Sequence, residues 1–401
     1  MVHELDVEQG PRAGTVLPSE LNTYTDPNTG ATVHRLTTDP DSDDRHLYFT
    51  TDGWYDDGRR LILRCKREGG RDLYSADLET GQLTRLTDLP NGVGGCTRVN
   101  PETNEVYFAY STTGDRYDAE YVLGLDVTTL DLRAVVQKPD GYDDYSFGVD
   151  DLLADGERLL VSVSERTGVE GHEANRAEYP HCAIFAANIE GADETELLHE
   201  EEYWISHVNA SPTRPELFTY CHEGPWGKVD NRIHIVNTET DRNEPLREVD
   251  EDEAVGHEYW LRDGEHVGYH GWQGENNNEN CFHGTIKWDD TDRRETEIPV
   301  RRTHCHSNTR ERFVCDGDDA KVPFLLLYEY DESTDEYDGP RKLATHAWDP
   351  DSPHPHARMS PDGSTIAFDG DPTGTDDAFL VEIPDFEDLP VYEDPTTGTR
   401  Q

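Results

Sequence analysis

Hydrophobic and polar positions alternate along most of the chain, in short runs separated by turn signals. The pattern is clearest over residues 56–88, which read DDGRRLILRCKREGGRDLYSADLETGQLTRLTD. An Asp-Gly turn leads into one alternating run, a second follows at DLYSADL, and the turn ETGQ introduces a third at LTRLTD. Alternation with a period of two is typical of half-buried strands, and Asp-Gly and Thr-Gly pairs are typical of tight turns. The segment therefore predicts three consecutive β-strands.

Related units recur along the rest of the chain, and seven can be traced. They start roughly 40 to 55 residues apart, which is the repeat period of β-propeller blades. The last unit, SPDGSTIAFDGD with AFLVEIP, has only two clear strands, whereas GATVHRLTTD (30–39) is a strand without a unit of its own. We predict an all-β, seven-bladed propeller that this N-terminal strand closes, which removes open sheet edges. It is expected to be a single domain over residues 13–386, with residues 1–12 and 387–401 as poorly ordered tails.

The chain is strongly acidic, with 86 Asp and Glu against 35 Lys and Arg and a formal net charge of −51. The acids are dispersed, and 7 Trp, 19 Tyr and 11 Phe are enough for an apolar core. A folded chain of this charge is best explained by a salt-rich cytoplasm, because salt screens the self-repulsion. We therefore expect a homologue of halophilic archaeal type. Binding to nucleic acid is disfavoured, because phosphates would be repelled.

The seven cysteines are odd in number, scattered and free of CxxC pairs, so the sequence predicts no disulfide framework. The first residues, MVHELDVEQGPRAG, contain no apolar segment of a signal peptide. No run of roughly 18 apolar residues is present either. We expect a cytoplasmic protein with no membrane association, and the oligomeric state stays open.

Four segments interrupt the repeat with polar residues that suit chemistry. They are TYCHEGPWGKVDNRIHI (219–235), VGHEYWLRDG (255–264), RRTHCHSNTRERF (301–313) and DPDSPHPHARMSPDG (349–363). Each lies at or near the start of a blade, and the first strands of propeller blades line a central funnel. Taken singly, their residues also fit structural roles, such as histidines that bridge blades or an arginine paired with a nearby acid. Because the same blade position recurs, we expect the four segments to converge.

The last of these segments holds two histidines around one proline. Proline restricts its own φ and favours an extended conformation in the residue before it, and residues i and i+2 of an extended segment point to one side. His354 and His356 should therefore point together, as two metal ligands or as two arms of an anion clamp. Neutral imidazoles with an oxygen ligand suit Mn, Fe, Co, Ni or Zn better than Ca. Asp351 could supply the oxygen, whereas Cys305 should point away from its neighbour His304.

The segments resemble the oligogalacturonate lyase family, seven-bladed propeller enzymes that degrade pectin. The residues that carry the resemblance are CHEGPW…VDNRI (221–233), GHEYWLRDG (256–264), HCHSN (304–308) and HPHARMSPDG (354–363). RHLYFTTDG with DLYSADLETGQLTRLTD is similar to the first blade of the family. The resemblance spans nearly the whole chain in the same order.

The resemblance implies a cytoplasmic enzyme that cleaves short oligogalacturonides, often digalacturonate, by β-elimination with bound Mn²⁺. It implies that His257 is the Brønsted base and that Arg232 is the charged partner at the reacting uronate. It also implies that the metal ligands are His304, His354 and His356.

The fourth ligand departs from the family pattern. The family has a Gln three residues before the HPH pair, and Asp351 stands there in this chain, with Asp349 as a competitor for the role. A carboxylate adds negative charge on a shorter arm. Metal preference and substrate are therefore open to change.

The chemistry agrees with these residue types. Removing the C5 proton of a uronate builds up charge on its carboxylate, which a divalent cation stabilises as a Lewis acid. A neutral histidine with a pKa near its unperturbed value of about 6.5 accepts the proton. An arginine holds the carboxylate through two hydrogen bonds. Further contacts to the acidic oligosaccharide are expected from His222, His207, Arg45 and His46.

Two other functions fit parts of the sequence. One is a lyase that acts on another uronate oligosaccharide. The other is a non-catalytic, TolB-like propeller that binds a protein partner. A binding module has no need for histidines at adjacent blade entries, so the clustering favours an enzyme. A calcium-binding propeller is disfavoured because no DxDxDG loop is present.

Overall fold

The computed structural model describes residues 5, 7–68, 70–115, 117–170, 172–190, 195–224, 228–274, 280–298, 304–317, 322–347 and 354–393. Two compact units divide the chain. The first comprises Met1–Leu17, Thr51–Ser75 and Leu83–Val249, and the second comprises Pro18–Thr50, Ala76–Gln82 and Asp250–Gln401. Secondary structure in the described residues is almost entirely β, apart from the helix α1 (His172–Arg176) and the 3-10 helix η3 (Phe386–Asp388).

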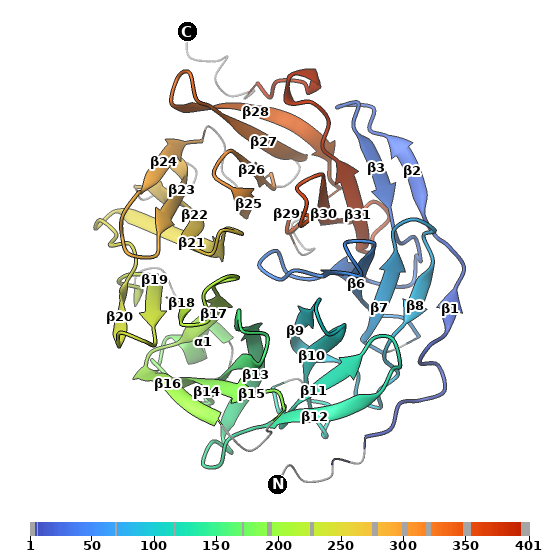
Figure 1. Ribbon diagram of the computed structural model, residues 1–401, viewed down its shortest axis with the longest axis vertical. Helices are drawn as coiled ribbons and strands as arrows, with labels where there is room; N and C mark the ends of the chain where they lie inside the picture. Colours follow the sequence, from blue (N-terminus) through green and yellow to red (C-terminus); the bar gives the residue numbers. More distant parts are fainter. Residues whose placement is uncertain are drawn as a thin grey trace. The chain divides into compact units, whose positions relative to one another are not determined.

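Four antiparallel sheets are built mainly from the first unit (Figure 1). In pairing order, the first contains β1 (Val16–Leu17), β8 (Leu83–Arg85), β7 (Asp72–Asp77) and β6 (Arg60–Cys65), with β5 (Trp54–Tyr55) beside β6. The second contains β12 (Leu132–Gln137), β11 (Tyr121–Asp126), β10 (Glu105–Tyr110) and β9 (Gly94–Asn100). The third contains β13 (Tyr145–Leu152), β14 (Arg158–Glu165), β15 (His181–Asn188) and β16 (Thr195–Glu202). The fourth contains β17 (Ile205–Ala210), β18 (Leu217–His222), β19 (Ile233–Asn237) and β20 (Arg242–Pro245).

Three further antiparallel sheets belong to the second unit, which also holds β4 (Asp44–His46). The first contains β21 (Glu253–Trp260), β22 (His266–Gln273), β23 (Cys281–Lys287) and β24 (Arg294–Glu297). The second contains β25 (Cys305–Thr309), β26 (Arg312–Cys315), β27 (Phe324–Asp331) and β28 (Glu336–Thr345). The third contains β2 (Asn22–Thr25), β3 (Thr32–Arg35), β31 (Asp377–Glu382), β30 (Thr365–Gly370) and β29 (Arg358–Met359).

The seven sheets confirm the predicted all-β, seven-bladed propeller. The predicted closing strand is confirmed as well. β3 pairs antiparallel with β31, with Val33 opposite Val381, so strands from both ends of the chain share the last blade (Figure 1). That the whole of residues 13–386 is one domain stays a prediction.

The apolar core lies between successive sheets of each unit. One cluster joins Tyr107 and Val122 of the second sheet to Val161 of the third. In the other unit, Val314 of the β25–β28 sheet packs with Ile366 of the last sheet. Central strands are therefore buried on both faces, which removes area from water on each side. This explains why their alternation is less regular than that of edge strands.

Parts of both predicted tails are packed against the sheets. Gln9 Nε2 donates to the carbonyls of Leu86 and Leu130 at 3.1 and 3.3 Å. At the other end, the backbone N–H of Lys342 donates to Pro390 O at 2.9 Å, and Tyr392 is only 8% exposed. These parts of the tails therefore find partners on the blades, while the domain boundaries at 13 and 386 stay a prediction. Residues 394–401 lie outside the described residues.

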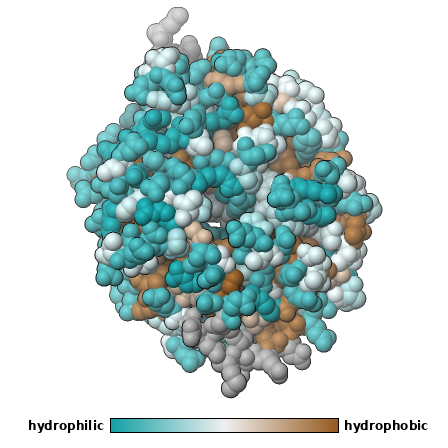
Figure 2. Space-filling model, in the orientation of Figure 1, coloured by the Kyte–Doolittle hydropathy of each residue, from teal (hydrophilic) through white to brown (hydrophobic). Residues whose placement is uncertain are grey.

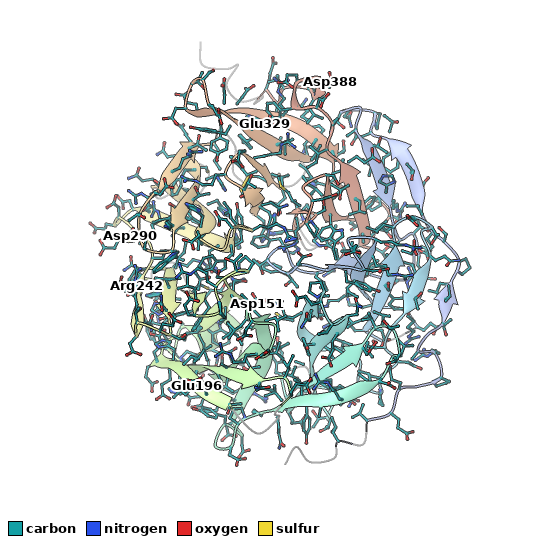
Figure 3. The ribbon with its side chains drawn as sticks, in the orientation of Figure 1. Asp151, Glu196, Arg242, Asp290, Glu329 and Asp388 are labelled. Carbon is teal, nitrogen blue, oxygen red and sulfur yellow. A yellow bond between two sulfur atoms is a disulfide. The ribbon has the colours of Figure 1, made fainter. Side chains whose placement is uncertain are left out.

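Some of the acids lie on exposed turns and outer strands. Glu196 on β16, Asp290 after β23 and Asp388 in η3 are exposed, and Figure 3 labels each of them. On the face that Figure 2 shows, hydrophilic residues cover most of the surface and hydrophobic ones form separate patches. Within the described residues, no helix has the length and apolar character that a membrane crossing requires.

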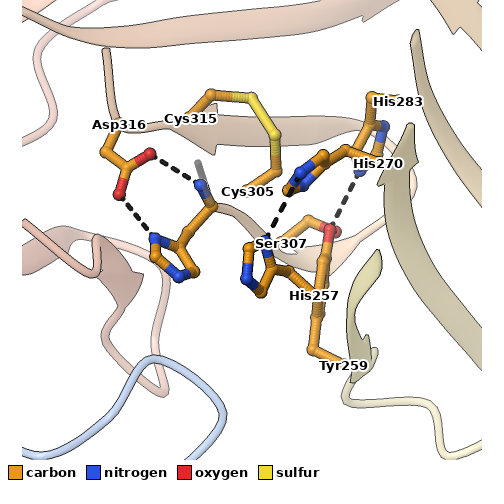
Figure 4. The surroundings of a disulfide bond; sticks show 9 residues. His257, Tyr259, His270, His283, Cys305, Ser307, Cys315 and Asp316 are labelled. Carbon is orange, nitrogen blue, oxygen red and sulfur yellow. Dashed lines mark hydrogen bonds and ion pairs between the residues drawn. A yellow bond between two sulfur atoms is a disulfide. The ribbon is translucent and has the colours of Figure 1, made fainter. Parts of the chain in front are cut away.

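One disulfide bond corrects the expectation that the cysteines form none. Cys305 on β25 and Cys315 on β26 face each other across the hairpin and are joined through their sulfur atoms (Figure 4). Both are fully buried, in an apolar cluster with Cys281 and Phe313. The number and spacing of the cysteines do not predict this pair. Cys305 and Cys315 are ten residues apart, and only the strand register of the hairpin brings them face to face.

Replacing both Cys305 and Cys315 by alanine is expected to lower the free energy of unfolding by about 3 kcal/mol, because the bond closes a short loop in the unfolded chain. Denaturant titration with and without a dithiol reductant measures this. Reductant should destabilise the wild type and the Cys281→Ala control, and leave the double variant unchanged. Equal stability of the wild type in both conditions would contradict the prediction.

Candidate metal centre and its surroundings

A repeated β-bulge positions histidines at the first strands of two blades. The register of β21 with β22 shifts between Gly256 and Tyr259, so that two residues oppose one. β17 shifts in the same way between Ser206 and Asn209. The first extra residue is a histidine in each strand, with φ of 51° at His257 and 47° at His207. Bulges re-aim side chains, and this left-handed region is costly for residues other than glycine, so such positions cluster at functional sites.

Three histidines of the second unit come together as the sequence predicts. His304, His354 and His356 each offer a ring nitrogen within 4.8 Å of the others. Ring centroids lie 5.1 Å apart for His304 and His354, and 4.5 Å apart for His304 and His356. His356 has φ of 53°, so the two HPH rings converge through a left-handed residue rather than through extended alternation alone. Burial lowers the pKa of His356 well below its usual range, which keeps its nitrogen lone pair available to a metal.

Asp316 holds His304 through its backbone and its ring. One carboxylate oxygen accepts the backbone N–H of His304 at 2.7 Å, and the other lies 2.9 Å from Nδ1. Asp316 N–H donates back to His304 O at 3.0 Å. Burial alone would raise the pKa of Asp316, but the charge and hydrogen bonds of His304 lower it well below its usual range. A carboxylate on Nδ1 fixes the tautomer that leaves Nε2 as a ligand atom, as in carboxylate–histidine–metal groups. The residues present therefore fit a transition metal.

His257 lies beside this cluster. Its ring centroid is 4.3 Å from that of His304, and its Nδ1 is 3.4 Å from Nε2 of His270 on β22 (Figure 4). Two residues further on, the hydroxyl of the buried Tyr259 contacts His283 Nε2 at 3.0 Å and Ser307 Oγ at 2.9 Å (Figure 4). These contacts join β21, β23 and β25, so neighbouring blades fix the strand that carries His257.

Aromatic side chains after β4 enclose the cluster. The ring of Tyr48 lies 4.9 Å from His356, and that of Phe49 lies 4.9 Å from His304. His46 is 5% exposed, and its Nε2 lies 3.4 Å from Pro355 O. Burial lowers the pKa of His46 to about 4. His46 therefore contacts the backbone of the HPH segment, and its predicted contact with substrate stays a prediction.

The remaining predicted residues of this unit have other surroundings. Arg45 forms an ion pair with the buried Asp376. The side chain of Cys305 points away from His304 into the apolar cluster, as predicted. Asp351 and its competitor Asp349 lie outside the described residues, so the fourth ligand stays a prediction.

The other predicted residues belong to the first unit. Arg232 is 5% exposed and lies, with His207, around the carboxylate of Glu223. His222 has both ring nitrogens engaged, with Nε2 2.8 Å from Glu201 and Nδ1 3.1 Å from Asp230. It also stacks on Tyr203, with ring centroids 3.8 Å apart. His222 is thus the centre of an internal ion-pair cluster, and its predicted sugar contact stays a prediction.

The His222 cluster makes stability depend on pH. Burial would raise the pKa of Glu201, but hydrogen bonds from His199 and His222 lower it to about 2. Burial would lower the pKa of His222, but Glu201 and Asp230 raise it above 6.5. The carboxylate contributes stability above about pH 4.5 that is lost as the pH falls through about 2. The imidazolium contributes stability below pH 6.5 that is lost as the pH rises through its raised pKa.

Replacing His222 by phenylalanine should therefore cost about 1.5–3 kcal/mol of unfolding free energy near pH 6, the range for hydrogen bonds to charged groups. The difference from the wild type should shrink at alkaline pH. Urea titrations from pH 5 to 10, in a double-mutant cycle with Glu201→Gln, measure the coupling. A coupling energy that stays constant with pH would contradict this account.

Sequence reasoning missed the residues that support the cluster. Asp316 directly follows β26, and His270 lies in the middle of β22, so each is a single polar residue at the second strand of its blade. In the sequence, Phe49 has the pattern of an ordinary core residue. The available signal was register: once Cys305 and Cys315 face each other, the adjacent pair is His304 and Asp316.

The family model described as oligogalacturonate lyase matches residues 12–387 of the chain. The chain belongs to the oligogalacturonate lyase family. Two curated relatives are similar over 93% of this chain and 98% of their own length. An oligogalacturonide lyase of Pectobacterium atrosepticum is 24% identical, and an oligogalacturonate lyase of Dickeya dadantii is 25% identical.

Solved structures of family members share the fold. An oligogalacturonate lyase in complex with manganese is 22% identical, with a TM-score of 0.79 over 93% of this chain and 98% of that chain. The oligogalacturonate lyase of Vibrio parahaemolyticus is 21% identical, with a TM-score of 0.79 over 93% and 99%. Family membership classes the chain with the carbon–oxygen lyases that act on oligogalacturonides.

Proposed function

We propose that the chain is an oligogalacturonate lyase that cleaves short oligogalacturonides, digalacturonate among them, by metal-assisted β-elimination. The observation that carries this proposal is the position of His257, whose ring lies 4.3 Å from a ring of the three-histidine cluster. A base beside a site for a Lewis acid is the arrangement that removal of an α-proton from a carboxylate requires. The curated relatives carry the same activity in their names.

In this proposal, His304, His354 and His356 hold a divalent transition metal, with Asp351 as the fourth ligand. The related solved structure contains manganese, which makes Mn²⁺ the first candidate. When bound, the metal would supply positive charge to the carboxylate of the reacting uronate. The Asp316 carboxylate keeps the proton of His304 on Nδ1, so that the cluster presents a lone pair.

The proton and the leaving group are handled by other groups. His257 accepts the C5 proton, the C4–O bond to the departing sugar breaks as a C4=C5 double bond forms, and the departing oxygen takes a proton from solvent water. His270 lies 3.4 Å from Nδ1 of His257 and limits the rotation of that ring. Arg232 serves as the charged partner of the uronate carboxylate. Of the residues predicted to contact the sugar, His207 is the best candidate to assist Arg232 at the uronate carboxylate. Its side chain is half-buried.

The net charge of −51 repels an anionic substrate, so the activity should depend on salt concentration. We propose that activity needs molar salt, as in a halophile, because screening shortens the range of this repulsion.

The test follows ultraviolet absorbance of the unsaturated product from digalacturonate in molar KCl, with added Mn²⁺ and with EDTA. Metal-dependent growth of absorbance that falls at low salt supports the proposal. A metal-loaded, folded protein without turnover would redirect it to other uronate oligosaccharides. A protein that holds no metal under any of these conditions would favour a propeller that binds a protein partner.

A further inference from the structure

Glu223 lies at the centre of a cluster of cationic side chains in the first unit. It follows β18 directly, and its oxygen Oε2 accepts a hydrogen bond from Ser206 Oγ at 2.5 Å. The guanidinium of Arg176, at the end of α1, lies 3.3 Å from the same oxygen. His207 Nε2 and Arg232 Nη1 lie 3.9 and 4.0 Å from the other oxygen, Oε1. Side chains from three other segments thus meet at the Glu223 carboxylate.

The same region also has the residue types of a metal site. His207, Cys221 and Glu223 bring one ligand atom each within 4.8 Å of one another. A divalent cation there would add two positive charges within reach of Arg176 and Arg232, whose distances to the Glu223 carboxylate are 3.3 and 4.0 Å. Like charges this close repel strongly where the side chains are largely buried. The cluster is therefore better explained as an anchor for cations of the protein itself.

The carboxylate is ionised over the working pH range. Burial would raise the pKa of Glu223, but His207, Arg232 and Arg176 lower it to about 2. The chain around it is well fixed, because Glu223 N–H donates to Trp204 O at 3.0 Å and Arg176 stacks over the Trp204 ring at 5.4 Å. A permanent negative charge held in this way orients the cations around it.

We propose that Glu223 is a positioning residue, which holds Arg232 and the bulge histidine His207 in the orientation that receives the carboxylate of an acidic sugar. The inference rests on the proposed function, since it gives Arg232 a substrate to hold. Arg176 and Ser206 fix the carboxylate from one side, and Arg232 and His207 are aligned on the other. Small displacements of such groups cost about 10²-fold in rate.

The test is Glu223→Gln, which keeps the shape and an acceptor for Ser206 but removes the charge. We expect kcat on digalacturonate to fall about 10- to 100-fold, with metal content unchanged, and Glu223→Asp to recover part of the loss. The double variant Glu223→Gln with Arg232→Lys should be no slower than Arg232→Lys alone, because both changes disrupt the same placement of Arg232 by Glu223. A merely structural role would lower stability without this non-additivity.

The matched control is Glu216→Gln. Glu216 pairs with Arg214 at 2.7 Å near the start of β18, so the same change breaks an Arg–Glu pair elsewhere in the same sheet. Its kcat should equal that of the wild type. Full activity of Glu223→Gln, or additive losses with Arg232→Lys, would overturn the inference.

Calorimetric binding of digalacturonate separates this inference from the proposed function. The titration uses His257→Ala enzyme with and without Glu223→Gln. If the wild type binds digalacturonate without cleaving it, the proposed reaction fails. Weaker binding by the protein that also carries Glu223→Gln than by His257→Ala alone would still support the positioning role. Equal affinity of the two proteins, or binding by neither, refutes it.

Discussion

Replacing His257 by alanine is expected to lower kcat on digalacturonate by about 10²- to 10⁴-fold, the range for loss of a general base. Metal content should stay at the wild-type level, because the three clustered imidazoles are unchanged. The physical reason is local: the bulge in β21 places this ring 4.3 Å from His304, beside the site proposed for the metal. Initial rates and metal analysis on the same preparations measure both effects.

His266→Ala is the matched control for this variant. His266 lies on β22 of the same sheet and pairs with Asp263 at 2.7 Å in an exposed turn. Its removal should leave kcat unchanged. If His257→Ala retained the wild-type rate, the assignment of the base would be wrong. If that variant lost its metal, His257 would belong to the ligand set instead.

The second large expected effect is a loss of affinity for Mn²⁺ that is greater in one variant than in another. His304→Ala should lower affinity for Mn²⁺ below detection, because it removes one of the three proposed imidazole ligands. Asp316→Asn keeps every ligand and should weaken affinity by about 10- to 100-fold, the usual cost of losing a carboxylate that orients a ligating histidine. The amide no longer fixes the proton on Nδ1, so part of the population presents the wrong nitrogen. Equilibrium dialysis against Mn²⁺ measures both without recourse to activity.

Asp331→Asn provides the comparison for the Asp316 variant, since Asp331 ends β27 of the same sheet and caps an exposed turn through Ser333 at 2.8 Å. Its affinity for Mn²⁺ should match the wild type. Equal affinities for Asp316→Asn and wild type would show that the buried pair serves folding alone. Retention of metal by His304→Ala would remove His304 from the ligand set.

Local pattern was sufficient for the architecture. Period-two alternation and Asp-Gly turns are properties of neighbouring residues, so they predicted the strands, the seven units and the N-terminal strand that pairs with β31. The same holds for His304, His354 and His356, because their motifs stand at repeated positions of consecutive blades. Their convergence in the second unit follows from that repetition.

The sequence by itself thus determined the propeller and the histidines at its blade entries, since both depend on short-range order. Tertiary structure alone decided their surroundings. Register across the β25–β26 hairpin paired Asp316 with His304 and Cys305 with Cys315, and a bulge turned His257 toward the cluster. In the sequence Glu223 is one of 86 acids, and only the fold brings three other segments around it. Such contacts depend on which strands pair and with what offset, and no single stretch of sequence contains that information.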